Sequence, residues 1–172
     1  MDSTLLGALI AATIAALVSC GVALWTSKQN RDLENKKILA IKKEELYRAC
    51  IDFHHSMLLY LNATLSPLHR ERSLYDKAGA LKEESNGKIE IIINIYFNSI
   101  DISTVKKLAA EFEGRYVSIA RRHFEEKNKD KDTPDNPLLN DIKFYDNASN
   151  AYDKLAESIK KLKKSVREIK IF

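Results

Sequence analysis

The sequence predicts an all-α protein in which an N-terminal membrane-spanning helix continues into an antiparallel bundle of three to four helices. Three observations favour this class. An apolar run without a charged residue extends from Leu5 to Trp25, long enough to cross a bilayer as a helix. Apolar side chains repeat in steps of three and four near the C-terminus, as on a long helix. The 172 residues include five Gly and three Pro, too few for an all-β fold with many tight turns.

The N-terminal run has two possible meanings, a cleaved lipoprotein signal or an uncleaved span. Residues 17–20 read LVSC and so end on a cysteine, as a lipoprotein signal does. A cleaved signal, however, needs a basic start and an apolar stretch of about 7–15 residues. This chain starts Met-Asp-Ser-Thr, and its apolar run continues beyond Cys20. We therefore assign residues 1–26 to a transmembrane anchor.

Basic residues on one side of the span predict its orientation. Asp2 is the one charged side chain before Ser27, whereas Lys and Arg are frequent from Lys28 onward. Because Lys and Arg are retained on the cytoplasmic side, we expect the N-terminus outside and residues 27–172 in the cytoplasm, at the cell (inner) membrane. Trp25 lies where an interfacial aromatic side chain is expected.

Small residues recur at every fourth position of the span. The row consists of Gly7, Ala11, Ala15, Ser19 and Ala23. Small side chains in this register let two membrane helices approach closely, so the row predicts self-association into a homo-oligomer. The alternative is that Ala and Gly are simply common in membrane spans.

The segment that follows the span is predicted to continue the same helix. No Gly or Pro occurs between Gly21 and Pro67. Residues 27–45 form a charged helical stalk, and a helical bundle is assigned to residues 46–172. Apolar residues then take helical spacing, at Leu46, Cys50, Phe53, Met57, Leu61 and Leu65.

Turn signals divide the middle of the chain. Ser66-Pro67 predicts the start of a second helix, and Asn86-Gly87 predicts its end. Residues 88–97 (KIEIIINIYF) are rich in β-branched residues but have no partner strand, so we interpret them as a buried helical segment. After a break at 98–101, a further helix is expected to bury Val105, Leu108, Phe112, Tyr116, Ile119 and His123, and residues 127–137 form a polar loop.

The last helix carries the clearest pattern in the chain. Its apolar seam comprises Tyr145, Ala148, Tyr152, Leu155, Ile159, Leu162, Val166 and Ile169. Such a seam packs either within an antiparallel bundle or between chains, and the apolar faces of the other helices favour the bundle. The same helix carries Lys160, Lys161, Lys163, Lys164, Arg167 and Lys170. These residues predict either a basic patch at the membrane surface or a solvated helix face.

Few residues are candidates for catalysis or metal binding. Cys50 and His54 share a helix face, but a metal site needs three or four ligands, so Cys50 is assigned to the core. Arg48 and His54 have R-x5-H spacing, which resembles the R-x4-6-H motif of HEPN-type ribonucleases; the resemblance implies a nuclease. The sequence lacks a phosphate-binding glycine loop and the metalloprotease or serine-hydrolase motifs, so we expect no enzyme activity, cofactor or metal.

These observations lead to three functional hypotheses. The first is a single-pass membrane protein that holds a helical interaction or sensing module at the cytoplasmic face, for an unidentified protein partner. The second is a membrane-perturbing effector of the toxin or phage-defence type, which oligomerises and depolarises the bilayer. The third is a membrane-anchored nuclease that uses Arg48 and His54. With 28 basic against 24 acidic residues, the charge balance disfavours specific nucleic-acid binding.

Overall fold

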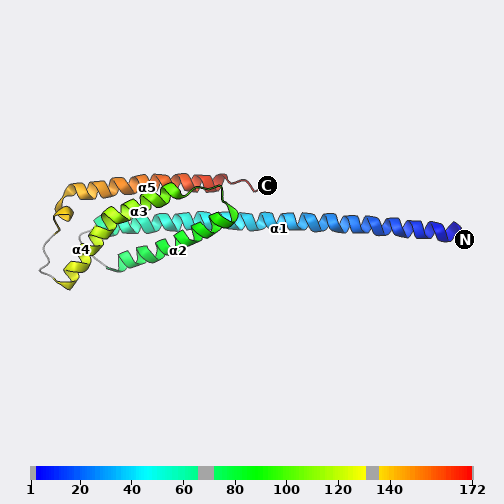
Figure 1. Cartoon of the computed structure of the whole chain (residues 1–172), viewed down its shortest axis with the longest axis horizontal. Helices are drawn as coiled ribbons and strands as arrows, with labels where there is room; N and C mark the ends of the chain where they lie inside the picture. Colours follow the sequence, from blue (N-terminus) through cyan, green and yellow to red (C-terminus); the bar gives the residue numbers. More distant parts are fainter. Residues whose placement is uncertain (1–2, 66–71, 131–135, 172) are drawn as a thin grey trace. The chain divides into compact units, whose positions relative to one another are not determined.

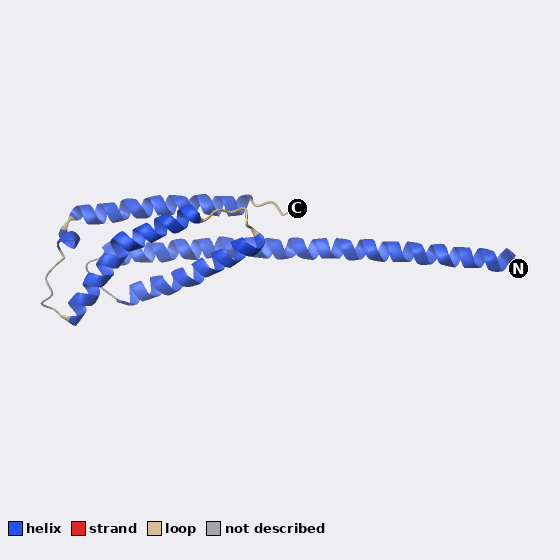
Figure 2. Ribbon diagram, viewed as in Figure 1, coloured by secondary structure: helices blue, strands red, loops and turns tan. Residues whose placement is uncertain are grey.

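The computed structural model describes residues 3–65, 72–130 and 136–171, and these residues are almost entirely helical (Figures 1 and 2). The α-helices are α1 (Ser3–Leu65), α2 (Arg72–Tyr96), α3 (Ser103–Phe112), α4 (Ser118–Lys129) and α5 (Ile142–Glu168). A π-helical segment, η1 (Glu113–Val117), joins α3 to α4, and a 3-10 turn, η2 (Pro137–Asn140), precedes α5. Since the described ranges contain no strand, the predicted all-α class is confirmed.

The long first helix is confirmed, because α1 continues for 63 residues. By their internal contacts, the residues form two units, Met1–Ile41 with Ile171–Phe172, and Lys42–Lys170. We call the second of these the helical unit. The absence of helix-breaking residues from 22 to 66 explains the length of α1.

The first unit contains an apolar segment, residues 10–25, that is exposed along its whole length. Its side chains are all exposed, and Leu17, Leu24 and Trp25 expose 64–74% of their surface. Within the described residues, α1 is the one helix long and apolar enough, by length and composition, to cross a membrane.

The helical unit is built around the apolar faces that the sequence predicts for α1 and α5. On α1, Leu46, Cys50 and Met57 are completely buried. On α5, Leu155, Ile159 and Val166 are completely buried against helices of the same chain. Burial of aliphatic side chains on this scale, at about 1.5–3 kcal/mol each, is the main force that holds the helices together.

The start of the α5 seam differs from the prediction. Phe144 is buried, whereas Tyr145 is only half-buried and donates its hydroxyl proton to the Leu139 carbonyl at 2.7 Å. The end also differs, because Ile169 lies beyond the last residue of α5 and is half-buried. A strict heptad count misplaces these ends because a straight helix turns every 3.6 residues rather than every 3.5.

Contacts between α1 and α5 show that the two helices run in opposite directions. Lys43 lies against Arg167 and His54 lies against Tyr152, so residue numbers rise on one helix as they fall on the other. The end of α5 therefore returns to the side of the helical unit where the chain enters it at Lys42. Figure 1 shows α5, α3, α1 and α2 lying along one another in this unit.

Ion pairs connect α2 to the α3–η1 segment, also in opposite directions. Lys82 bonds Glu113 at 2.6 Å, and Glu90 bonds Lys106 at 2.7 Å. The chain reverses between these helices at residues 97–102, which confirms the predicted break near 98–101.

The predicted turn at Asn86-Gly87 is wrong, because α2 passes through it without interruption. The Asn86 amide donates to the Glu90 carboxylate at 2.8 Å, one helical turn later, and Gly87 does not adopt a positive φ. The helix therefore continues into residues 88–96, which confirms the interpretation of KIEIIINIYF as helical. Ile89, Ile92 and Ile93 are buried, so packing outweighs the local preference for a turn.

The predicted polar loop at 127–137 begins later than expected, since α4 continues to Lys129. Basic residues lie in the last turn of α4, where their positive charge interacts favourably with the helix dipole. The predicted helix start at Ser66-Pro67 lies outside the described residues. The helix expected after residue 101 is present as α3, η1 and α4. Of its predicted core residues, Val105, Phe112 and His123 are buried, whereas Leu108, Tyr116 and Ile119 are half-buried.

We expect Gly87→Ala to stabilise the helical unit by about 0.4–1 kcal/mol, because alanine lowers the backbone entropy of the unfolded chain. A Cβ atom at Gly87 would meet no atom within 4 Å. Urea unfolding of the full chain in detergent, followed by near-ultraviolet circular dichroism, measures the change. Gly79→Ala is the matched control in the same helix and should gain less, since its Cβ would lie 3.2 Å from the Tyr60 hydroxyl. Destabilisation by Gly87→Ala would contradict a continuous helix.

Candidate functional site

A basic cavity of about 440 Å³ lies between α1 and α5 in the helical unit. Its α1 wall is Tyr47, and its α5 wall consists of Glu157, Lys160, Lys161, Lys163, Lys164 and Arg167. Five of the six predicted basic residues are thus brought to one cavity, and Lys170 does not line it. We refer to it as the α1–α5 cavity.

Arg167 is held in place by the aromatic ring of Tyr47. Its guanidinium carbon lies 4.7 Å from the ring centroid, and its Nη2 donates to the Tyr47 hydroxyl. Stacking and a hydrogen bond together restrict a side chain that otherwise has many rotamers. Within the described residues, Arg167 has no carboxylate partner.

Lys43 neutralises the carbonyl end of α5 beside the cavity. Its ammonium group donates to the carbonyl oxygens of Arg167 and Ile169, both at 2.8 Å. The last carbonyls of a helix carry partial negative charge, which would repel an anion. Lys43 reduces this repulsion where Arg167 is exposed.

Acidic residues compensate the cavity's positive charge only weakly. Lys160 lies 3.4 Å from Glu157, and Lys164 lies 3.8 Å from Glu168. All four side chains are at least 64% exposed, and such pairs contribute about 0–1 kcal/mol. Lys161 and Lys163 are on the same wall, and neither forms an ion pair with a described residue.

Cys50 and His54 lie on the same face of α1 but form no metal site. Burial raises the pKa of the Cys50 thiol to about 12, so the thiol is protonated and unreactive. The His54 ring stacks on the Tyr152 ring, and its Nε2 lies 3.1 Å from the Tyr152 hydroxyl. The described residues contain no group of three metal-ligating side chains.

Arg48 and His54, the pair with ribonuclease-like spacing, are not brought together. Arg48 is exposed and bonds Glu44 at 2.6 Å on the outer face of α1. His54 is half-buried and faces α5 through Tyr152. Six residues along a helix correspond to a rotation of about 240°, which separates the two side chains.

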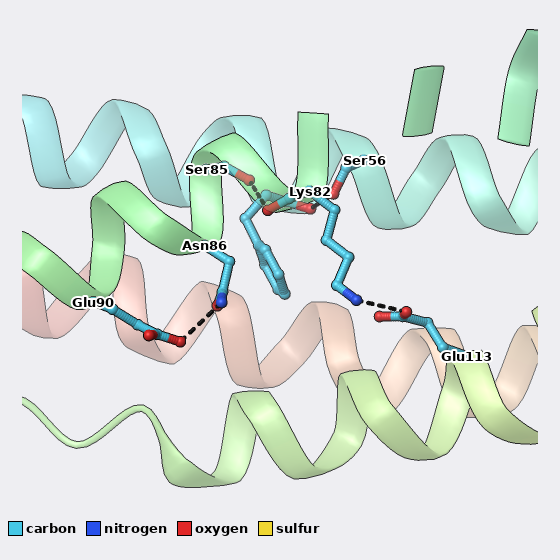
Figure 3. Close-up of polar contacts among 7 residues, drawn as sticks. Ser56, Lys82, Ser85, Asn86, Glu90 and Glu113 are labelled. Atoms are coloured by element: carbon cyan, nitrogen blue, oxygen red, sulfur yellow. Dashed lines mark hydrogen bonds and ion pairs between the residues drawn. The ribbon is translucent and has the colours of Figure 1, made fainter. Parts of the chain in front are cut away.

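A second cavity, of about 410 Å³, lies between α1, α2 and α3 and has Phe53 in its wall. Figure 3 shows the Lys82–Glu113 ion pair and the Asn86–Glu90 hydrogen bond at this site. Figure 3 also shows Ser56 and Ser85, whose hydroxyls bond backbone carbonyls of their own helices. These polar groups satisfy one another, so the arrangement connects helices and leaves no free charge for a ligand.

The small-residue row of α1 is fully accessible in the chain. Gly7, Ala11, Ala15, Ser19 and Ala23 are all exposed. The Ser19 hydroxyl donates to the Ala15 carbonyl at 2.8 Å. This bond satisfies the hydroxyl within the helix, as serine does in apolar surroundings.

Sequence reasoning found the basic residues but missed Tyr47 and Lys43, which organise them. Tyr47 directly follows the buried Leu46, and Lys43 belongs to the predicted stalk. Only the antiparallel return of α5 brings both residues to Arg167. The available signal was an aromatic residue at the edge of an apolar helix face.

We expect the helical unit to lose stability as the pH falls below about 6.5, with His54 responsible for part of the loss. Burial, then the charges of Lys163 and His55, lower the pKa of His54. The unfolded chain therefore binds more protons than the folded chain. The stabilisation that comes from His54 is fully present above the ordinary histidine pKa of about 6.5, and it decreases as the pH falls from there to the folded-state pKa.

His54→Gln should flatten this dependence when unfolding free energies from urea titrations are compared across a pH series. His55→Gln is the matched control, because His55 is the exposed neighbour, and it should keep most of the slope. Equal slopes for His54→Gln and the wild type would contradict the assignment.

The sequence and structure were compared with protein families, curated proteins and solved structures, and none of the three comparisons finds a match.

Proposed function

We propose that this chain is a single-pass membrane protein that holds a helical interaction module at the cytoplasmic face of the cell membrane. The observation that carries the proposal is the apolar segment, residues 10–25, in which every side chain is exposed. A helix that is apolar on all sides and unpaired is stable in hydrocarbon and unstable in water. The hydrocarbon core of a bilayer supplies the missing surroundings.

The proposed orientation places the N-terminus outside and the helical unit inside. Lys28, Arg31, Lys36 and Lys37 follow the apolar segment closely, and all are exposed. Since positive residues close to a span are retained in the cytoplasm, they favour this orientation over its reverse.

We propose that the helical unit is a closed antiparallel bundle that binds another protein through its surface. The buried seam of α5 and the oppositely directed contacts of its neighbours support the bundle. Ile91 and Ile95 on α2 expose 60% and 65% of their surface, whereas Ile89, Ile92 and Ile93 of the same helix are buried. Exposed apolar side chains on neighbouring turns of one helix are typical of a protein contact surface.

Self-association through the span is part of the proposal. The exposed row from Gly7 to Ala23 gives a second helix a shallow surface for close backbone contact. With the Ser19 hydroxyl bonded inside its own helix, the row has no unsatisfied polar group to disturb such packing. The expected assembly is a homo-oligomer, and its order sets the number of helical units presented at the membrane.

We expect the full chain to resist carbonate extraction from membranes, and Leu17→Lys to lower the inserted fraction. A lysine at the centre of a span costs about 2.5–3.5 kcal/mol. Leu33→Lys is the matched control, since Leu33 is another exposed leucine of α1 but lies beyond the apolar segment. Equal extraction of the two variants would contradict the anchor.

Orientation is tested in the same experiment with reporters fused to the C-terminus. A fluorescent protein that matures in the cytoplasm should be bright, and alkaline phosphatase, which is active only after export, should be silent. An active phosphatase would reverse the orientation.

We expect Ala11→Leu with Ala15→Leu to reduce the oligomer, because the larger side chains keep the two helix backbones apart. Cross-linking in membranes and light scattering in detergent measure the oligomer size. Thr13→Leu with Cys20→Leu is the matched control, as it adds leucines on the opposite side of the helix. An oligomer that survives the first pair, or that is lost equally with both pairs, would argue against packing through this row.

A further inference from the structure

We propose that the α1–α5 cavity is a binding site for a doubly charged phosphate group, as found in a phosphomonoester or a diphosphate. The inference goes beyond the proposed function, because it depends on residues of the helical unit and on no property of the apolar segment. Three features carry it: a positioned guanidinium, uncompensated lysines and a capped helix end.

The positioned guanidinium is the central feature. The Tyr47 ring supports one face of the Arg167 guanidinium, and the Tyr47 hydroxyl accepts one of its N–H groups. An arginine carries five N–H donors in a planar fork, so several donors stay available. A fork held in one orientation binds two phosphate oxygens with less loss of conformational entropy than a free side chain.

The uncompensated lysines supply the charge. Lys161 and Lys163 have no acidic partner among the described residues, and the partners of Lys160 and Lys164 lie at 3.4 Å and 3.8 Å and are exposed. Glu157 is the one carboxylate in the wall. With five cations and one carboxylate, the cavity matches a dianion better than a carboxylate ligand, which carries a single charge.

The helix end would oppose an anion without Lys43. Carbonyl oxygens at a C-terminus attract cations, and here those of Arg167 and Ile169 are already bonded to the Lys43 ammonium. The volume of about 440 Å³ is within the range of small-ligand pockets.

The second cavity provides the contrast that makes the assignment specific. There, Lys82 and Lys106 bond carboxylates at 2.6 Å and 2.7 Å. An anion would have to break these ion pairs, whereas in the α1–α5 cavity the lysines are free or only weakly paired. Positive charge alone therefore does not select the site; the absence of carboxylate partners does.

The phosphate group has two possible sources, a soluble diphosphate or the phosphomonoester headgroup of a lipid. Both present the same dianionic oxygens to Arg167. Inorganic pyrophosphate is the probe for the first source, and phosphatidic acid in phosphatidylcholine nanodiscs is the probe for the second.

The test is calorimetric titration of the full chain with pyrophosphate in phosphatidylcholine nanodiscs. We expect saturable binding that Arg167→Gln weakens about tenfold or more, the loss expected for one charge-assisted hydrogen bond. Tyr47→Leu should also weaken binding, although it removes no charge, because the guanidinium loses its support. Lys154→Gln is the matched control on the exposed face of α5 and should leave the affinity nearly unchanged.

Repeating the titration with phosphatidic acid in the discs distinguishes the sources. If phosphatidic acid leaves the pyrophosphate affinity unchanged, the site is assigned to a soluble ligand. If phosphatidic acid competes with pyrophosphate, and Arg167→Gln removes this competition, the site is assigned to the lipid headgroup. Either outcome supports the proposal. The proposal is overturned if neither pyrophosphate nor phosphatidic acid binds. It is also overturned if Tyr47→Leu has the wild-type affinity while Lys154→Gln loses as much affinity as Arg167→Gln. Thermal unfolding of each variant shows that it is folded. The titration can be repeated in detergent, so its failure is distinguishable from failure of the membrane anchor.

Discussion

The antiparallel packing of α1 against α5 is the interaction on which the helical unit depends. Leu46, Cys50 and Met57 on one helix, and Leu155 and Ile159 on the other, lose all contact with water. Because the helices run in opposite directions, this burial also sets which polar residues meet along their edges. The register of α1 against α5 also brings His54 to Tyr152 and Arg167 to Tyr47. Packing of the core therefore positions the polar side chains at the edges of the two helices.

The same helix, α1, meets two different physical demands along its length. Beyond Lys42 its apolar residues occupy one face, and that face is buried by other helices of the chain. In residues 10–25 apolar side chains surround the helix, and all of them are exposed. Hydrophobic burial is completed within the protein in the first case, whereas in the second the apolar surface of the helix is left exposed.

The distribution of ion pairs distinguishes regions that hold the fold together from a region available for binding. Between α2 and α3, lysines and carboxylates bond across helices at short distances, which satisfies both charges and fixes the helix spacing. On the outer wall of α5, lysines outnumber carboxylates, and the pairs that exist are exposed and long. Arg167 is ordered by an aromatic ring rather than by an acid, so its charge stays available to a partner.

The all-helical class, the continuous α1, the buried faces of α1 and α5 and the helical state of residues 88–96 are all predictable from the sequence. Each follows from periodicity or from the absence of helix-breaking residues over many positions, signals that accumulate along a segment. Three other features depend on packing between helices. They are the passage of α2 through Asn86-Gly87, the burial of Phe144 rather than Tyr145, and the contact of Tyr47 and Lys43 with Arg167. These outcomes depend on contacts between residues up to 126 positions apart. A local turn preference of about 1 kcal/mol is outweighed by such burial, and no local pattern encodes which distant side chain will lie opposite.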